Sequence, residues 1–402
     1  MVRKDILRKD ALNFLTEFRD DTELIKIISG VRRCGKSTLM AQYIEMLKGA
    51  GIREENIVHI NLESSEFTKI SCGMELQDLV KERMGAGKNY VLIDEIQMIE
   101  GWETAINALR VDTNSDIYLT GSNSKLLSSE LSTYLTGRYV SIELLPLSFK
   151  EYLEFNGNGK DRYEMFRKYL TYGAFPMLDP YDSDEKIRAI LDGLYTSVIY
   201  KDVISRGEVR DSAVLEKIVR FMMANIGNPT SANNISKELH LDRKTVERYM
   251  RLLEEVFVMY RVDRYDIKST YLNPTPKYYS VDTGLRNLST GHSLEDHGRL
   301  LENVVYLELR RRRYKVRVGR YGDKEVDFSV MTPSGQVYYQ VTRSMTDETV
   351  MKRELDPLGK IDDNHPKIVI SEDRINENFK NGIKHVNIID WLLDTNEELT
   401  GI

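Results

Sequence analysis

A glycine-rich loop at Gly30–Ser37 constrains the fold of this chain more than any other feature of its sequence. The β-branched run Ile25–Ser29 before it predicts a buried strand, and Thr38–Leu47 after it has the spacing of a helix. Glycines let the backbone of such a loop turn its N–H groups inward, and the following helix adds the positive end of its dipole. A strand, this loop and a helix in that order predict a phosphate-binding site in an α/β fold.

The residue types in the loop indicate how it contacts a nucleotide. The ammonium of Lys36 suits the β- and γ-phosphates of ATP, and the hydroxyl of Ser37 suits Mg²⁺. The residues of this Walker A loop that we expect to bind ATP are Gly30, Arg33, Cys34, Gly35, Lys36, Ser37 and Thr38. The sequence therefore predicts ATP and Mg²⁺ as cofactors.

A second apolar run, Tyr90–Ile93, ends in the carboxylates Asp94 and Glu95. A strand that ends in an acid is a weak signal alone, but with the loop upstream it predicts a Walker B motif. Asp94 is expected to hold Mg²⁺ together with Ser37, directly or through water. Glu95 is expected to orient or deprotonate the attacking water, so the pair predicts hydrolysis of ATP rather than its storage.

Short β-rich runs alternate with helical segments through the first part of the chain. The expected strands are Ile25–Ser29, Ile57–Leu62, Tyr90–Ile93, Ile117–Thr120 and Tyr139–Leu144. This alternation predicts a parallel sheet covered by helices on both faces. Because Ile57–Leu62 lies between the two motifs, we do not expect the loop strand and the Asp-Glu strand to be neighbours. That is the arrangement of the additional-strand class of P-loop NTPases.

Two polar positions downstream leave alternatives open. Asn123 follows the fourth strand, where it is predicted either to sense the γ-phosphate or, with Ser122, to cap a helix over 124–131. Arg138 follows Gly137 directly before the fifth strand. It is predicted either to reach the site of a neighbouring subunit in a homo-oligomer or to be a solvated residue after a helix-capping glycine.

Length and composition limit the remaining possibilities. A chain of 402 residues exceeds what one core usually serves, so we expect domains at 1–150, 151–270 and 271–402. The net charge of −6 argues against a general coat for nucleic acids but leaves a local basic face possible. Two cysteines indicate a reducing compartment, and no apolar run approaches the ~20 residues that cross a bilayer. We therefore expect a cytoplasmic protein that has no membrane partner.

Several stretches together carry a resemblance to a known family. GVRRCGKST, VLIDEIQ, YLTGSNSKLL, LTGRY and LPLSFKEY resemble the AAA-type P-loop ATPases of bacteria and archaea that have an uncharacterised C-terminal region. The stretches KYLTYGAFP, VIYKDVISR, VDTGLRN, LLENVVYLEL and KEVDF extend the similarity over nearly the whole chain. The resemblance implies an AAA+/STAND-like ATP-binding core, a winged helix and a C-terminal α/β fold similar to PD-(D/E)xK nucleases.

The middle of the chain has its own helical pattern. Ile235–Leu239 and Thr245–Val256 predict a helix-turn-helix with Asp242 as the cap of the second helix, and Phe257–Tyr260 predicts a wing. Basic residues are expected on the exposed face of the second helix: Arg243, Lys244, Arg248 and Arg251. Contact with double-stranded DNA and contact with a protein both remain open. Asn273–Pro276 is expected to be a linker.

The nuclease-like fold implied by the resemblance uses a helical Glu, a strand Asp, and a Glu and a Lys on the next strand. Glu302 and Asp327 match, Asp327 at the expected end of a strand, but Gln340 and Thr342 stand in place of the acid and the lysine. A neutral amide is a poor ligand for a hard divalent cation. We therefore expect a degenerate domain that serves binding or assembly.

The sequence as a whole predicts an ATP-binding, ATP-hydrolysing AAA-type protein associated with nucleic acid. Two other functions remain open. One is a nucleotide-gated, STAND-like switch that acts through protein contacts, and the other is an ATP-dependent nuclease.

Overall fold

The computed structural model describes residues 6–393 except 125–134, 136, 157–158, 180–181, 205–208, 210, 268–271, 292, 375–376 and 379–381. The chain forms two compact units. The first spans Met1–Pro146 with Glu255–Phe257, and the second spans Leu147–Glu254 with Val258–Ile402. The helix expected over 124–131 lies outside the described residues apart from Ser124.

The first unit is built on five parallel strands in the order β2-β3-β4-β1-β5. Their bounds are β1 (Ile25–Ser29), β2 (Ile57–Asn61), β3 (Asn89–Asp94), β4 (Ser115–Gly121) and β5 (Tyr139–Glu143). All five expected strands are confirmed. The loop strand and the Asp-Glu strand are also separated as expected, because β4 lies between β1 and β3.

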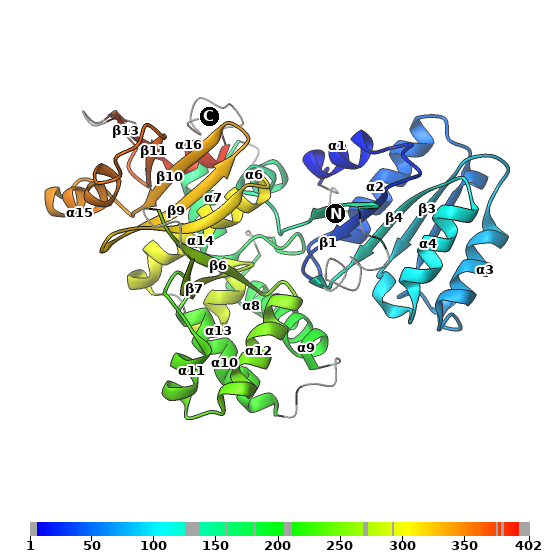
Figure 1. Cartoon of the computed structure of the whole chain (residues 1–402), viewed down its shortest axis with the longest axis horizontal. Coiled ribbons are helices and arrows are strands. Elements are labelled where there is room, and N and C mark those ends of the chain that lie inside the picture. The colour runs from blue at the N-terminus through cyan, green and yellow to red at the C-terminus, as the bar shows by residue number, and fades with distance from the viewer. Residues whose placement is uncertain are drawn as a thin grey trace. The chain divides into compact units, whose positions relative to one another are not determined.

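Helices cover both faces of this sheet (Figure 1). They are α1 (Lys9–Glu17), α2 (Lys36–Gly49), α3 (Gly73–Arg83) and α4 (Trp102–Asp112), with short 3₁₀ turns η1 (Glu54–Asn56), η2 (Ser65–Phe67) and η3 (Ile96–Met98). Side chains alternate between the faces along each strand. Ile25 and Ile27 therefore join the core formed with Leu76 of α3 and Ile106 of α4.

The second unit contains an eight-stranded sheet in the order β12-β13-β11-β10-β9-β8-β6-β7. Its strands are β6 (Met259–Asp266), β7 (Leu272–Ser280), β8 (Lys315–Tyr321), β9 (Lys324–Thr332), β10 (Gly335–Val341), β11 (Lys367–Ser371), β12 (Glu377–Asn378) and β13 (Ile383–Asn387). The expected domain boundary at residue 270 falls between β6 and β7, which pair antiparallel within this one sheet.

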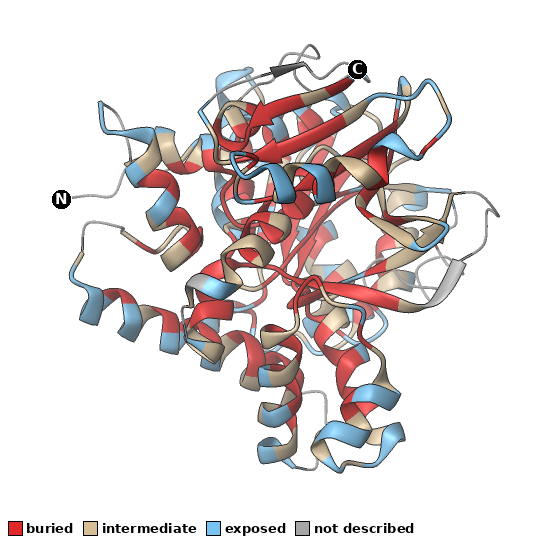
Figure 2. Cartoon of the chain, turned by 90° about the vertical axis from the view of Figure 1, so that its left-hand side faces the viewer, coloured by how far each residue is buried: buried red, intermediate tan, exposed pale blue. Residues whose placement is uncertain are grey.

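Helices of the second unit fall into two runs along the chain. The first run is α6 (Phe149–Asn156), α7 (Arg162–Tyr172), α8 (Asp184–Tyr195), the π-helix η5 (Thr196–Lys201), α9 (Asp202–Ile204), α10 (Ser212–Ala224), α11 (Ala232–Leu239) and α12 (Arg243–Glu255). The second is α13 (Thr283–Thr290), η6 (Leu294–Asp296), α14 (His297–Arg311), α15 (Glu348–Gly359) and α16 (Ile388–Leu393). Most of these helices have a buried and an exposed side (Figure 2). Among the described residues, the helices are too short or too polar to cross a bilayer.

The expected linker at Asn273–Pro276 is wrong, because this segment lies inside β7. Two prolines favoured a break, since proline cannot donate a backbone hydrogen bond in a sheet. β7 is however the edge strand of its sheet, where proline is tolerated. Its inner side still pairs with β6, with Val262 opposite Lys277.

Two stretches that carried the family resemblance pack against each other where α7 ends and α13 begins. The Asp282 carboxylate accepts hydrogen bonds from the backbone N–H groups of Ala174 (2.7 Å) and Leu285 (3.0 Å). Burial nevertheless raises the pKa of Asp282 to about 6. A Cβ on Gly173 would lie 2.0 Å from Asp282 Oδ1, and one on Gly284 would lie 2.0 Å from the Tyr172 carbonyl oxygen. The two glycines allow the backbones to meet this closely.

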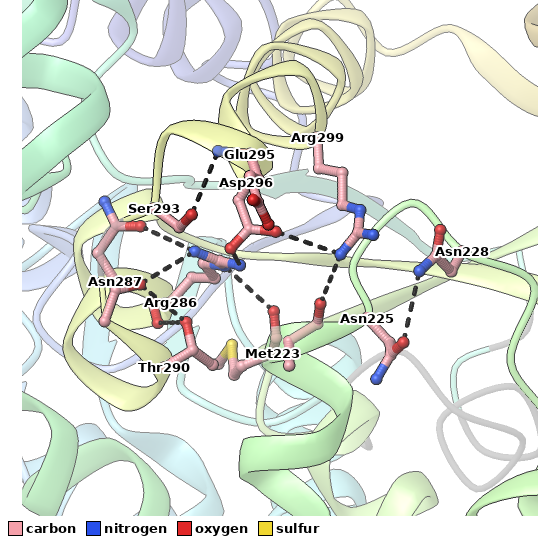
Figure 3. Close-up of polar contacts among 12 residues, drawn as sticks. Met223, Asn225, Asn228, Arg286, Asn287, Thr290, Ser293, Glu295, Asp296 and Arg299 are labelled. Carbon is pink, nitrogen blue, oxygen red and sulfur yellow. Dashed lines mark hydrogen bonds and ion pairs between the residues drawn. The ribbon is translucent and has the colours of Figure 1, made fainter.

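A buried arginine on α13 contacts residues of neighbouring helices (Figure 3). Arg286 donates to the carbonyl oxygens of Met223 (3.2 Å) and Gly291 (3.2 Å) and pairs with Asp296 at 2.6 Å. Arg299 donates to the other Asp296 oxygen at 3.3 Å and to the Ala224 carbonyl at 3.0 Å. These contacts connect α10, α13 and α14 through backbone carbonyls.

We expect Gly284→Ala to lower the free energy of unfolding by about 1–3 kcal/mol, the range for adding carbon to a packed site. Gly298 is the matched control, because it is also helical but has open space around its Cβ position. Gly298→Ala should stabilise by up to about 1 kcal/mol through helix propensity. Urea unfolding measures both variants. Equal effects of the two substitutions would contradict the close contact.

Candidate functional site

The residues that the sequence predicts as one site follow neighbouring parallel strands. The loop begins directly after β1, Asp94 ends β3, and Ser122 and Asn123 come directly after β4. Because β4 pairs in parallel with both β1 and β3, the carboxyl ends of all three strands lie at one edge of the sheet. The structure therefore brings the loop, the acids and Asn123 to the same edge.

The loop requires its glycines. Gly30 has φ of 144° and Gly35 has φ of 104°, in the region that side chains rarely adopt. A Cβ on Gly30 would lie 2.2 Å from the Leu144 carbonyl oxygen, in the chain that leaves β5. The exposed Arg33 also has a positive φ, 68°. Helix α2 then begins at Lys36 with Gly35 as its N-cap, so its amino end faces the loop.

The other expected members of the loop differ in exposure. Ser37 and Thr38 are exposed in the first turn of α2, whereas Cys34 is a fully buried free thiol. Burial raises the pKa of Cys34, so this side chain stays neutral. A contact of Cys34 with nucleotide would therefore come from its backbone.

Arg8 supports the loop from the chain before α1, and sequence reasoning missed it. Its buried guanidinium donates to the carbonyl oxygens of Cys34 (3.1 Å) and Leu145 (2.9 Å). This contact joins the loop to the segment after β5. No motif surrounds Arg8, and the contact spans 137 residues to Leu145, so no local pattern could reveal it.

Lys36 and Glu95 lie together beneath the loop. Lys36 Nζ donates to the carbonyl oxygens of Gly30 (3.1 Å) and Val31 (3.3 Å) and lies 3.5 Å from Glu95 Oε1. Burial raises the pKa of Glu95, but the Lys36 ammonium and the Gln97 amide outweigh it, so the net pKa is lowered. Glu95 is therefore ionised at neutral pH and can accept a proton.

Thr120 holds both acids from the inserted strand β4. Its hydroxyl donates to Asp94 Oδ1 and accepts the backbone N–H of Glu95 at 3.0 Å. Glu95 has φ of 56°, a left-handed conformation that a glutamate rarely adopts. The sequence predicted Thr120 only as a strand residue. The polar side chain of Thr120 at the end of a buried run was visible in the sequence, but its place beside the acids depends on the strand order.

Arg138 is not part of this group. It precedes β5, and its carbonyl oxygen accepts a hydrogen bond from Ile25 N–H (2.9 Å) at the start of β1. Because Arg138 directly precedes β5, which runs parallel to β1, it lies at the amino ends of the strands, opposite the loop. Its side chain is exposed. Its action in a neighbouring subunit stays a prediction.

The residues present fit ATP and Mg²⁺. Gly30 and Gly35 have the positive φ values that let a phosphate-binding loop turn, and Ser37 and Asp94 offer the oxygen ligands that Mg²⁺ prefers. Within the described part of the chain, no cluster of three or more acidic, histidine or cysteine side chains could hold a metal ion.

Comparison with known proteins places this chain in a family. Residues 22–153 match the family model described as an AAA domain, and residues 163–296 match a domain of unknown function (DUF8612). An uncharacterized protein of Haemophilus influenzae is 39% identical over 98% of this chain and 100% of its own length. An uncharacterized protein of Methanocaldococcus jannaschii is 30% identical over 82% of this chain and 77% of its own. The chain belongs to the family of these two proteins.

Solved structures are similar at a lower level. The Aeropyrum pernix ORC1 protein, solved in complex with DNA, has a TM-score of 0.33 and 12% identity over 71% of this chain and 93% of its own. The replication initiator DnaA, solved with AMPPCP and single-stranded DNA, has a TM-score of 0.29 and 17% identity over 62% and 90%. The AAA domain match covers the first unit from residue 22 and continues to residue 153 in the second unit.

A second group of charged residues lies in the sheet of the second unit. Lys277 of β7 lies 3.0 Å from Glu302 of α14. It also lies 2.9 Å from Glu325 and 4.0 Å from Asp327, both of β9. Tyr279 donates to Glu302 at 2.7 Å. Burial lowers the pKa of Lys277, but the three carboxylates outweigh it and raise it overall. The lysine is therefore charged and offsets part of the charge of the acids. Burial and the Glu302 carboxylate raise the pKa of Asp327, and Arg264 pairs with Glu325 at 2.7 Å.

The expectations for this region need one correction. Glu325 and Asp327 lie at the start of β9, not at the end of a strand, because Gly322 (φ of 64°) turns the chain from β8 into β9. Gln340 donates to Glu354 at 2.8 Å instead of facing a cation. Sequence reasoning missed Lys277 because the first part of its strand, Asn273–Pro276, was predicted to be a linker.

We expect Lys277→Met to destabilise the protein by about 3–5 kcal/mol, because the partly buried Glu302 and Asp327 would lose their cation, whereas Glu325 would keep Arg264 at 2.7 Å. Lys324→Met on β9 is the matched control, since Lys324 forms a half-exposed pair with Asp356 at 3.3 Å. That change should cost less than about 1 kcal/mol. Denaturant unfolding at neutral pH measures both, and a small effect of Lys277→Met would show that the acids are neutralised otherwise.

Proposed function

We propose that this protein binds ATP with Mg²⁺ at the carboxyl edge of the first sheet and hydrolyses it. The observation that carries the proposal is the meeting of Lys36 and Glu95 at 3.5 Å, directly beside Asp94. A phosphate-binding cation and an ionised carboxylate then face the same space. The AAA domain match over residues 22–153 supports this assignment.

Each residue of the edge has a role in this proposal. The loop from Gly30 and the amino end of α2 bind phosphate oxygens, and Lys36 exchanges its carbonyl contacts for the β- and γ-phosphates. Ser37 and Asp94 hold Mg²⁺, which neutralises charge on the phosphates. Glu95 accepts the proton of the attacking water.

Three further assignments depend on this proposal. Arg33, Cys34 and Thr38 complete the loop around ATP. Asn123, at the same edge, contacts the γ-phosphate. Arg138 acts on the ATP site of a neighbouring copy, since the ATP site of its own chain lies at the other end of the strands.

We expect Lys36→Ala to lose most ATP affinity, because its ammonium meets the phosphate charge directly. Glu95→Gln should bind ATP normally and lower the hydrolysis rate at least about 100-fold, the range for loss of a general base. Lys48→Ala is the control, because Lys48 lies on the same helix in exposed ion pairs. Phosphate release and equilibrium binding of ATP measure these effects.

Two outcomes would contradict the proposal in different ways. Equal rates in the wild type and Glu95→Gln would remove Glu95 from the reaction. Tight ATP binding without turnover in the wild type would favour a nucleotide-gated switch that acts through protein contacts.

We also propose that residues 212–280 form a winged helix that contacts double-stranded DNA. The order α10, a bridge between Pro229 and Lys277, α11, α12, β6 and β7 supports this fold. Asp242 caps α12 by accepting the Thr245 N–H at 2.9 Å. Arg243 and Lys244 are exposed at the amino end of α12, where a recognition helix meets DNA.

We expect the double reversal Arg243→Glu/Lys244→Glu to weaken duplex binding and reduce its salt dependence, because fewer counterions are released. The logarithmic slope should fall by about 2, at about 0.9 per lost phosphate contact. Lys217→Glu/Arg220→Glu on α10 changes the same charge at exposed positions and should have little effect. Titrations at several salt concentrations measure both, and equal losses would contradict a specific role of α12.

The acids of the second sheet are not part of the proposed activity. Lys277 and Arg264 already pair with these acids, and neither Gln340 nor Thr342 restores the groups expected of a nuclease. We therefore expect DNA to stay intact in the presence of Mg²⁺ or Mn²⁺.

A further inference from the structure

The turn after β3 contains a contact that no sequence pattern indicated. Gln97 lies in η3 (Ile96–Met98), two residues beyond Glu95. Its amide Nε2 donates to Glu95 Oε2 and approaches Ser122 Oγ at 3.4 Å, beyond the end of β4. One side chain therefore connects Glu95 to the neighbouring strand.

The turn keeps Gln97 in this place. The left-handed conformation of Glu95 reverses the chain, and the Met98 N–H donates to the Glu95 carbonyl at 3.0 Å. Ile96 is fully buried in the core, whereas Met98 is exposed. With Ile96 anchored, the side chain of Gln97 turns back towards Glu95.

Charge fixes which end of the amide faces Glu95. An ionised carboxylate is only an acceptor, so the NH₂ group must face it and the carbonyl must point away. That carbonyl, Gln97 Oε1, is a buried atom without a hydrogen-bond partner among the described residues. The amide is therefore held by a charge-assisted contact with Glu95 and a longer contact with Ser122.

Among the described residues, the side chains of Lys36, Gln97 and Ser122 contact the Glu95 carboxylate, and the Gln97 contact does not depend on Lys36 when phosphate binds. The proposed function requires Lys36 to turn from Glu95 and the loop carbonyls to phosphate. Glu95 would then lose its Lys36 contact on Oε1 but keep the Gln97 amide on Oε2. The backbone contact with Thr120 fixes the Glu95 main chain, not its carboxylate.

We propose that Gln97 is the positioning residue that aims the Glu95 carboxylate at the attacking water. This inference rests on the proposed ATP hydrolysis. Gln97 acts through Glu95 and contacts neither nucleotide nor metal. It is therefore expected to affect the chemical step and not the binding of ATP.

The test is Gln97→Met, which keeps the length of the side chain and removes its amide. We expect kcat for ATP hydrolysis to fall about 10- to 100-fold, the range for one lost hydrogen bond to a charged group. KM and the equilibrium affinity for ATP should stay within about 2-fold, as expected when only transition-state interactions change. Met98→Ala is the control, because Met98 is the exposed neighbour in the same turn.

A double-mutant cycle separates positioning from a general structural effect. In a Glu95→Gln background, Gln97→Met should change the residual rate less than about 2-fold, because residues that act as a unit are not additive. If Gln97→Met folds poorly, Gln97→Glu is the second variant for the same measurement. It places a carboxylate against Glu95 and should lower kcat at least as much.

Each result decides the question. Wild-type kcat in Gln97→Met, equal losses in both backgrounds, or a matching loss of ATP affinity would overturn the role of Gln97 and leave the proposed hydrolysis intact. A wild-type protein that binds ATP without turnover would instead remove the proposed hydrolysis, and the role of Gln97 with it.

Discussion

The double pairing of β4 is the constraint on which the candidate site depends. This strand pairs in parallel with β1 on one side and with β3 on the other. Its end therefore comes between the loop and the two acids, and Thr120 there contacts Asp94 and the backbone of Glu95. Without β4 in this position, β1 and β3 would be neighbours, and the Thr120 contacts with Asp94 and Glu95 would be missing.

The sequence predicted the parts of the site that follow one another in the chain. A buried run, a glycine loop and a helix specify their own local structure, so β1, Gly30–Ser37 and α2 could be recognised together. The same holds for β3 and its two acids. Arg8 and Thr120 could not be assigned, because their contacts join segments far apart in the sequence and depend on strand order. Gln97 is close to Glu95, but its contact depends on the left-handed turn between them.

The second unit was harder to predict because local patterns there oppose the tertiary structure. The prolines of β7 indicated a break, yet an edge strand tolerates them. That mistake also hid Lys277, whose charge balances carboxylates from α14 and β9. The helices α11 and α12 were easier, since their apolar stripes and the cap at Asp242 are local features.

The left-handed backbone at Glu95 has a consequence for how this chain can change. A non-glycine residue in that region costs on the order of 1 kcal/mol, whereas glycine adopts it freely. Glycine at position 95 would remove this backbone cost, but it would also leave the buried Lys36 ammonium without the carboxylate that lies 3.5 Å away. The ion pair outweighs the backbone cost, so a drift towards glycine at this position requires Lys36 to change as well.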